Sequence, residues 1–138
     1  LTMLKTICYI SDSKTDESLD SLKTLFQQAE ENNIKNEITG ILIYKNKNFL
    51  QVFEGESKVV DETFKRIVKN KKHHNIFKII ETNIDSRIFE DYNYGFTTIS
   101  DKTTIRQLQE YFDWLKDADN MVANEIIALV KNFTKDID

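Results

Sequence analysis

The chain contains few of the residues that cross-link a protein, bind metal ions or interrupt its backbone. Its 138 residues include no proline, three glycines, two histidines and one cysteine. A single cysteine, Cys8, excludes an internal disulfide and a cysteine-rich zinc site. His73 and His74 are neighbours in the sequence, so on a helix or strand they point apart and make a poor metal pair. We therefore predict no metal, and the simpler interpretation of both histidines is a surface or packing role.

Several functional classes are disfavoured by other absences. No segment approaches the ~20 consecutive apolar residues of a transmembrane helix, and the first residues do not resemble a signal peptide. The net charge of -4 disfavours a nucleic-acid binder. The nucleophile-elbow, Walker A and dinucleotide-binding motifs are missing, and no base is evident that would activate Cys8. We therefore expect a cytoplasmic protein that is not an enzyme and has neither a membrane nor a direct nucleic-acid partner.

One segment departs from this acidic balance. Residues 65–78 contain basic side chains and neither aspartate nor glutamate. The simpler interpretation is a solvated helix face, and the alternative is a surface that attracts phosphate, on a cofactor or a polynucleotide. The basic residues are Lys65, Arg66, Lys69, Lys71, Lys72 and Lys78.

Apolar periodicity predicts an α+β fold. Helices are expected over about 16–33 and after residue 57, with Gly55 and Ser57 ending a strand and capping the second helix. The order βαββαββ matches a ferredoxin-like sheet with two helices on one face. The expected strands, which are short, apolar and rich in β-branched or aromatic residues, are 4–11, 38–44, 48–53, 77–84 and 95–99.

The pattern changes after residue 100. Apolar residues recur at helical spacing from Ile105 to Leu115, and a second helix is expected from Asn120. Thr104 and Gln107 have the spacing of a capping box. The hairpin either docks on the domain or forms a dimer contact, and we expect a homo-oligomer that uses these helices. The chain is thus divided into a domain, residues 1–100, and a C-terminal helical extension of two helices, residues 101–138.

Three polar residues fall on elements that are expected to form the core. Tyr9 and Gln51 lie in the middle of predicted strands, and Asn33 closes the first helix. A buried polar group without a hydrogen-bond partner costs about 1–3 kcal/mol. Each side chain therefore either satisfies nearby backbone groups or converges with the others on a polar ligand. In a ferredoxin-like sheet the first and third strands are central neighbours, which places Tyr9 and Gln51 toward a cleft under the helices.

These residues belong to a longer set of sequence fragments. The fragments are Tyr9-Ile10-Ser11, Asn32-Asn33, Ile38-Thr39-Gly40-Ile41-Leu42 and Phe49-Leu50-Gln51-Val52-Phe53-Glu54-Gly55, followed by Arg66-Ile67, Lys72-His73 and Arg87-Ile88-Phe89. Together, over about residues 4–99, they resemble the BLUF domain, a sensor of blue light that uses a flavin. The strand with Thr-Gly followed by Phe-x-Gln-x-x-Glu-Gly is the most specific part.

The resemblance implies a photoactive site and the cofactor FAD. Tyr9 is similar to the tyrosine that donates an electron and a proton to the excited flavin, and Gln51 to the glutamine that bridges it to the flavin N5 and O4 edge. Asn33, with Asn32 beside it, is similar to the asparagine that pairs with the ring's carbonyl and N3 edge. Arg66 is similar to a residue that contacts the ring from the other side. Further cofactor-binding residues implied by the resemblance are Ile41, Phe49 and Ile67 as apolar walls, with Lys72 and His73.

The output side departs from the family pattern. Where the family often has Trp-Ser-Met, this chain has Tyr92-Asn93-Tyr94, so the positions tied to signal output are both tyrosine. We expect a photoreceptor that signals to an unidentified protein partner or changes its oligomeric state. One alternative is a light-insensitive ligand-binding or protein-interaction module. A small phosphatase-like enzyme is disfavoured because residues 12–16 are acidic and lack the glycines of a phosphate-binding loop.

Overall fold

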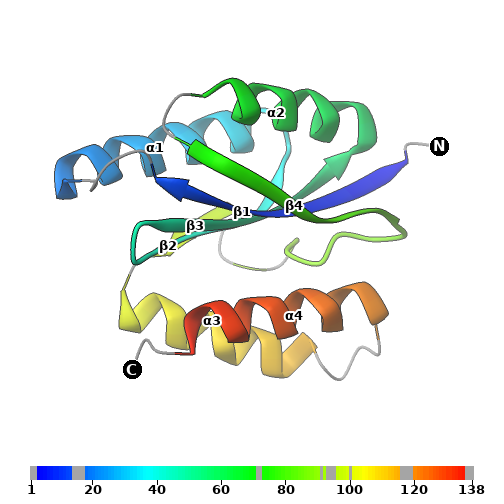
Figure 1. Ribbon diagram of the computed structural model, residues 1–138. Helices are drawn as coiled ribbons and strands as arrows, with labels where there is room; N and C mark the ends of the chain where they lie inside the picture. Colours follow the sequence, from blue (N-terminus) through cyan, green and yellow to red (C-terminus); the bar gives the residue numbers. More distant parts are fainter. Residues whose placement is uncertain are drawn as a thin grey trace.

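The strands form one mixed sheet that is covered by helices on both faces (Figure 1). The computed structural model describes residues 3–13, 18–70, 73–90, 92, 96–99, 101–115 and 120–135. In those residues the order is βαββαββαα. The strands are β1 (Leu4–Ser13), β2 (Thr39–Lys45), β3 (Asn48–Glu56), β4 (His73–Ile84) and β5 (Phe96–Ile99). The helices are α1 (Leu19–Lys35), α2 (Ser57–Lys69), α3 (Lys102–Leu115) and α4 (Met121–Thr134).

The order of strands in the sheet places β1 and β3 next to each other at its centre. The order is β4-β1-β3-β2-β5, with antiparallel pairing except between β2 and β5, which are parallel. In the β1–β3 register Tyr9 lies opposite Gln51. The expected α+β fold, with β1 and β3 as central neighbours, is confirmed.

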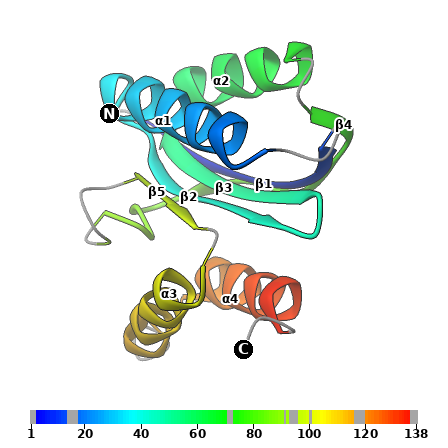
Figure 2. The same cartoon turned by 90° about the vertical axis from the view of Figure 1, so that its left-hand side faces the viewer.

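Each face of the sheet carries its own core. Helices α1 and α2 cover one face, and the α3–α4 hairpin covers the other (Figure 2). Because side chains alternate along a strand, Ile7 and Tyr9 of β1 belong to the first core and Cys8 to the second. The cavity-side core consists of Ile7, Tyr9, Leu22, Leu25, Ile38, Leu42, Phe49, Phe53, Val60 and Phe96. The hairpin-side core includes Cys8, Ile41, Ile43, Leu50 and Val52 of the sheet with Ile105, Leu108, Phe112, Ile126 and Val130 of the hairpin.

Of the two arrangements left open for the C-terminal hairpin, docking on the domain is the one observed. The hairpin-side core contains residues from both sides of the predicted boundary at residue 100, which itself stays a prediction. Helix α4 begins as expected, because the Asn120 side chain accepts a hydrogen bond from the Ala123 N–H at 3.1 Å. In the part of the chain that the structure describes, no helix combines the length and hydropathy of a membrane span.

The predicted boundary between β3 and α2 is wrong at both residues that were expected to form it. Gly55 does not end β3, because it pairs with Lys5 and leaves room for the Ile38 side chain, whose Cδ1 would lie 3.1 Å from an added Cβ. Ser57 is the first residue of α2 and does not cap it; Glu56 holds the cap position without a side-chain hydrogen bond. A glycine in a strand can thus mark close packing where the sequence suggests a break.

The expected capping box of α3 is also wrong. The Asp101 carboxylate accepts the Thr104 N–H at 2.8 Å, so the helix begins at Lys102, before Thr104. The hydrogen bond stabilises the ionised form of Asp101 and lowers the pKa of its carboxyl group. At the start of α1, Ser18 provides the cap by accepting the Ser21 N–H at 3.1 Å.

Part of the connection from β4 to β5 lies between the sheet and the hairpin. These two strands lie at opposite edges, so the chain must cross one face to reach the far edge. Ile88, Phe89 and Tyr92 of this connection are buried in the hairpin-side core. The described apolar residues of the connection are therefore part of that core.

Candidate functional site

The central contact of the site joins two polar side chains on neighbouring strands. The Tyr9 hydroxyl of β1 donates a short hydrogen bond to Oε1 of Gln51 on β3. Both side chains are buried, and they share a face because Tyr9 and Gln51 are register partners. Burial raises the pKa of Tyr9 well above its ordinary value of 10, so the phenol is a proton donor at neutral pH.

Aromatic rings surround the phenol of Tyr9. Its ring makes edge contacts with Phe53 of β3, at a centroid distance of 6.3 Å, and with Phe64 of α2, at 6.0 Å. The Lys78 ammonium lies 5.0 Å from the Phe64 ring centroid, on the solvent side of this cluster. The apolar packing fixes the ring of Tyr9 and keeps water from its faces.

A cavity of about 200 Å³ lies between α1, α2 and the sheet, and Gln51 forms part of its wall. Its apolar walls come from Leu25 and Ala29 of α1, Leu42 of β2 and Ile67 of α2. Within the described part of the chain, Nε2 of Gln51 has no hydrogen-bond partner, so this donor is available to a molecule in the cavity. The polar lining residues are Gln28, Asn32, Asn33, Gln51, Thr63, Arg66 and Asn70.

Five of the residues predicted from the sequence meet at this cavity. Asn32 and Asn33 come from the last turns of α1, Gln51 from β3, and Arg66 and Ile67 from α2. Asn33 is buried, and its carbonyl accepts the Ile38 N–H at 2.8 Å, which fixes the end of the helix against the start of β2. The Arg66 guanidinium donates to the Thr63 hydroxyl at 3.2 Å, which orients it along the α2 side of the cavity.

Two predicted apolar walls are placed differently. Ile41 belongs to the hairpin-side core, on the opposite face of the sheet, so the expectation that it lines the cavity is corrected. Leu42 takes that position because it is the register partner of Gln51 on β2. Phe49 lies on the correct face, in the cavity-side core, but its ring packs on Tyr44 at 5.0 Å and does not line the cavity.

The remaining lining residues were missed by sequence reasoning, although helical spacing could have identified them. Leu25, Gln28 and Ala29 precede Asn32 and Asn33 by three to eight positions and so share one face of α1. On α2, Thr63 precedes Arg66 by three positions, and Asn70, the C-cap residue, follows Ile67 by three, so both lie on the same side of the helix. Neither set stands out by composition, because these side chains are common on any amphipathic helix.

The other predicted site residues are separate from the cavity or lie outside the described part. Lys72 and Tyr94 fall outside the described residues, and His73 is described only as the first residue of β4, paired with Ser13. Tyr92 lies in the hairpin-side core, with its ring 4.8 Å from that of Tyr111. Its buried hydroxyl has no hydrogen-bond partner among the described residues, and burial raises the pKa of Tyr92 to about 12.

Cys8 has no role in this cavity. It is the β1 neighbour of Tyr9, but its side chain is buried on the hairpin side of the sheet. Burial raises the pKa of its thiol to about 12, so the reactive thiolate is scarce at neutral pH.

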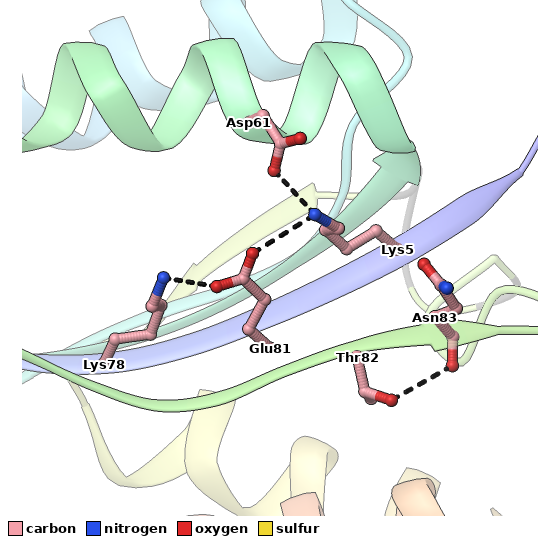
Figure 3. A network of polar contacts seen from close by, with 6 residues as sticks. All are labelled: Lys5, Asp61, Lys78, Glu81, Thr82 and Asn83. Carbon is pink, nitrogen blue, oxygen red and sulfur yellow. Dashed lines mark hydrogen bonds and ion pairs between the residues drawn. The ribbon is translucent and has the colours of Figure 1, made fainter.

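A chain of charged side chains links α2 to β1 and β4 beside the site (Figure 3). Lys5 Nζ lies 2.9 Å from Asp61 Oδ1 and 3.2 Å from Glu81 Oε2, and Glu81 also accepts a hydrogen bond from Lys78. The hydrogen bond to Asp61 raises the pKa of Lys5, and those from Lys78 and Lys5 lower the pKa of Glu81. The network pairs Lys78, the last basic residue of segment 65–78, with Glu81, an acidic residue outside that segment.

The cavity and its lining fit a flat heteroaromatic ring such as the isoalloxazine of a flavin. Apolar side chains are available for the faces of the ring, and Gln51, Asn32 and Asn33 supply amide donors and acceptors for its polar edge. The sequence profile of the BLUF family, sensors of blue light using FAD, matches residues 4–95. This chain belongs to the BLUF family.

Parts of this chain are similar in sequence or structure to known proteins that carry a BLUF domain. The blue light- and temperature-regulated antirepressor BluF of Escherichia coli strain K12 is 28% identical over 78 residues, which are 56% of this chain and 19% of that protein. BlsA in its photo-activated state is 26% identical, with a TM-score of 0.67, over 90% of this chain and 91% of BlsA. A structure of Klebsiella pneumoniae BlrP1 with FMN and cyclic diGMP has a TM-score of 0.74 at 22% identity, over 96% of this chain and 36% of BlrP1. The chain thus spans about a fifth of BluF and about a third of BlrP1.

Proposed function

We propose that the cavity binds the isoalloxazine ring of a flavin, and that the Tyr9–Gln51 pair is the light-operated switch of this BLUF protein. The observation that carries the proposal is the hydrogen bond from the Tyr9 hydroxyl to a glutamine that also lines the cavity. It connects a redox-capable phenol to the place where the ring would lie, through one side chain with both a donor and an acceptor end.

A bound flavin would supply the absorption of blue light and, in its excited state, a place for an electron. Tyr9 would give up that electron, and its hydroxyl would release the matching proton along the hydrogen bond to Oε1 of Gln51. The amide of Gln51, which has a donor and an acceptor end, would rotate or tautomerise. Return of the electron and the proton to Tyr9 would restore the phenol and leave Gln51 in a second hydrogen-bond arrangement, in which its amide would donate to the molecule in the cavity and shift the absorption to longer wavelength.

The remaining cavity residues hold and orient the ring. Asn33, which is buried, would offer its amide to the polar edge of the ring, with Asn32 beside it in the cavity lining. Arg66 would contact the ring from α2, and Ile67 with Leu42 would supply apolar contact. No general acid or base is required, and the chain acts as a sensor without being an enzyme.

We further propose that the flavin is FAD. Lys65, Arg66 and Lys69 place positive charge along α2, next to the cavity, where the phosphates of a dinucleotide would emerge. FMN is the alternative, because BlrP1 has been solved with FMN. Heat release of the bound cofactor followed by mass spectrometry distinguishes the two, and we expect FAD.

The switch is tested by the absorption spectrum of protein purified in the dark, recorded before and after blue light. We expect a flavin spectrum with a small red shift that reverses in the dark. Gln51→Leu should retain bound flavin and lose the red shift. Gln27→Leu is the matched control, because Gln27 is exposed on α1 outside the cavity, and it should respond like the wild type. An unchanged red shift in Gln51→Leu would show that the proposed switch is wrong.

The output is proposed to reach a protein partner, or a second copy of the chain, through the C-terminal helices in the cytoplasm. Trp114 of α3 and Met121 of α4 are exposed apolar side chains on this hairpin, and they are available for such a contact. The similar protein BluF is named a blue light- and temperature-regulated antirepressor, which supports an output through a partner. We expect light to change the amide hydrogen exchange of residues 102–134, and identical exchange in dark and light would remove this part of the proposal.

A further inference from the structure

Glu54 is a buried carboxylate on the same strand as Gln51. It lies three residues further along β3, and its side chain is on the opposite face of the sheet. Glu54 is fully buried, which is costly for a charged group unless hydrogen bonds compensate it. Burial raises the pKa of Glu54, while its hydrogen bonds and the nearby charge of Arg87 oppose that rise.

The Glu54 carboxylate holds the connection between β4 and β5. Its Oε1 accepts the Ile88 N–H at 2.8 Å, and its Oε2 accepts the Phe89 N–H at 2.8 Å. The Thr39 hydroxyl, which itself accepts from Arg87 at 3.0 Å, donates to Oε2 at 2.6 Å. Two consecutive backbone N–H groups are thus fixed to β3, which carries Gln51.

Helix α3 holds the same two residues from the other side. The Tyr111 hydroxyl donates a hydrogen bond to the Ile88 carbonyl, and the Tyr111 ring stacks on Phe89 with a centroid distance of 6.2 Å and an angle of 29°. Phe89 is fully buried, so the segment lies fixed between sheet and helix. A continuous hydrogen-bonded path therefore runs from Glu54 through the backbone of Ile88 to Tyr111.

We propose that Glu54 is a positioning residue that couples the switch on β3 to helix α3. The inference rests on the proposed function, because it requires a change at Gln51 to transmit. A strand is stiff along its length, so a shift of β3 at Gln51 moves Glu54 with it. Apolar side chains can slide past each other at small cost, whereas separating a buried carboxylate from two N–H donors leaves its charge without the hydrogen bonds that compensate its burial. Among the described residues, the Glu54–Ile88–Tyr111 path is thus a directional connection between β3 and the C-terminal helices.

The test compares light-minus-dark amide hydrogen exchange in α3 with the flavin red shift of the same sample. Glu54→Gln places an amide NH₂ against one of the two backbone N–H donors, and Tyr111→Phe removes only the hydroxyl at the other end of the path. We expect both variants to keep the red shift and to lose most of the light-induced change in α3, at least threefold. A purely structural role would alter exchange in dark and light equally and leave the difference intact.

The double variant and a matched control complete the test. If both residues act through the same segment, Glu54→Gln with Tyr111→Phe should lose no more than either variant alone. Thr39→Val removes a contact to the same carboxylate but leaves both backbone hydrogen bonds, and it should respond like the wild type. If Glu54→Gln does not fold, the light-induced exchange change in α3 of Tyr111→Phe tests the proposal by itself.

The outcomes separate this inference from the proposed function. Absence of a red shift in the wild type contradicts the proposed function. A red shift with no light-induced change in α3, or with a change that persists in Tyr111→Phe, contradicts the coupling through Glu54 and leaves the photochemistry standing.

Discussion

Three tyrosines show how the surroundings of a single phenol set its role. Tyr9 is buried and donates to Gln51, Tyr111 is partly buried and donates to the Ile88 carbonyl, and Tyr92 is buried with no partner among the described residues. All three are ordinary tyrosines in the sequence. The sheet register gives Tyr9 its partner in the proposed switch, and the position of α3 gives Tyr111 its partner in the proposed path to the helices and leaves the Tyr92 hydroxyl without one among the described residues.

The unpaired hydroxyl of Tyr92 leads to a prediction about stability. Removing a buried polar group that lacks a partner relieves a desolvation cost, so Tyr92→Phe should raise the free energy of unfolding by about 1 kcal/mol. Tyr111→Phe is the comparison, because it deletes a hydroxyl that is bonded and should lower the same quantity by about 1 kcal/mol. Urea denaturation measures both. A loss of stability in Tyr92→Phe would indicate that its hydroxyl is bonded in solution.

Side-chain chemistry alone identifies only the site residues that are unusual for their position, whereas Asn32, Arg66 and Ile67 were predicted from the resemblance to the BLUF domain. A tyrosine and a glutamine in apolar strands stand out, and both lie in the site. Ile41 and Leu42 do not differ in chemistry, and the choice between them depends on which face each occupies. Leu42 lies on the cavity side because it pairs with Gln51 in the β2–β3 register. That register depends on both strands, so it cannot be predicted from the sequence of β2 alone.

The β2–β3 pair depends on Gly40 for its close approach. Gly40 has a φ of 147°, and a Cβ at this position would lie 2.0 Å from the Val52 carbonyl oxygen. Gly40→Ala should therefore destabilise the protein by roughly 3 kcal/mol or more, because both the backbone angle and the contact are unfavourable. Gly55→Ala is the control: its nearest neighbour is the end of the Ile38 side chain at 3.1 Å, and we expect a loss below about 1.5 kcal/mol. Equal unfolding midpoints in urea for the two variants would contradict this account.

Element types were predictable, whereas element ends were less so. Helix α4 begins after Asn120 as predicted, whereas α1 begins at Leu19, with Ser18 as its cap, and not at about residue 16 as predicted. Asp101 caps α3 because the helix begins shortly after the end of β5. The spacing of Thr104 and Gln107 contains no information about where β5 ends, so it predicted the wrong cap. Strand β4 extends to His73, four residues before its predicted start at residue 77, because pairing with β1 continues beyond its apolar run.

The molecule as a whole has three layers, and the sheet requires cover on both faces. The hairpin-side face presents Ile41, Ile43, Leu50 and Val52 to α3 and α4. A chain that ends at residue 100 would expose this apolar surface to water. We therefore expect the shortened chain to self-associate and to unfold at a lower urea concentration than the full chain. Sedimentation velocity and urea denaturation measure these properties, and a monomeric fragment with the full chain's midpoint would contradict the prediction.

From the position of Ile88 and Phe89 beneath α3, we expect an order of events in folding. Ile88 and Phe89 lie beneath α3, so this segment must reach its place before the helix closes over it. Were the hairpin to dock first, it would have to lift off again to admit the segment. The C-terminal helices should thus be the last part to become protected during refolding and the first to detach when the protein opens.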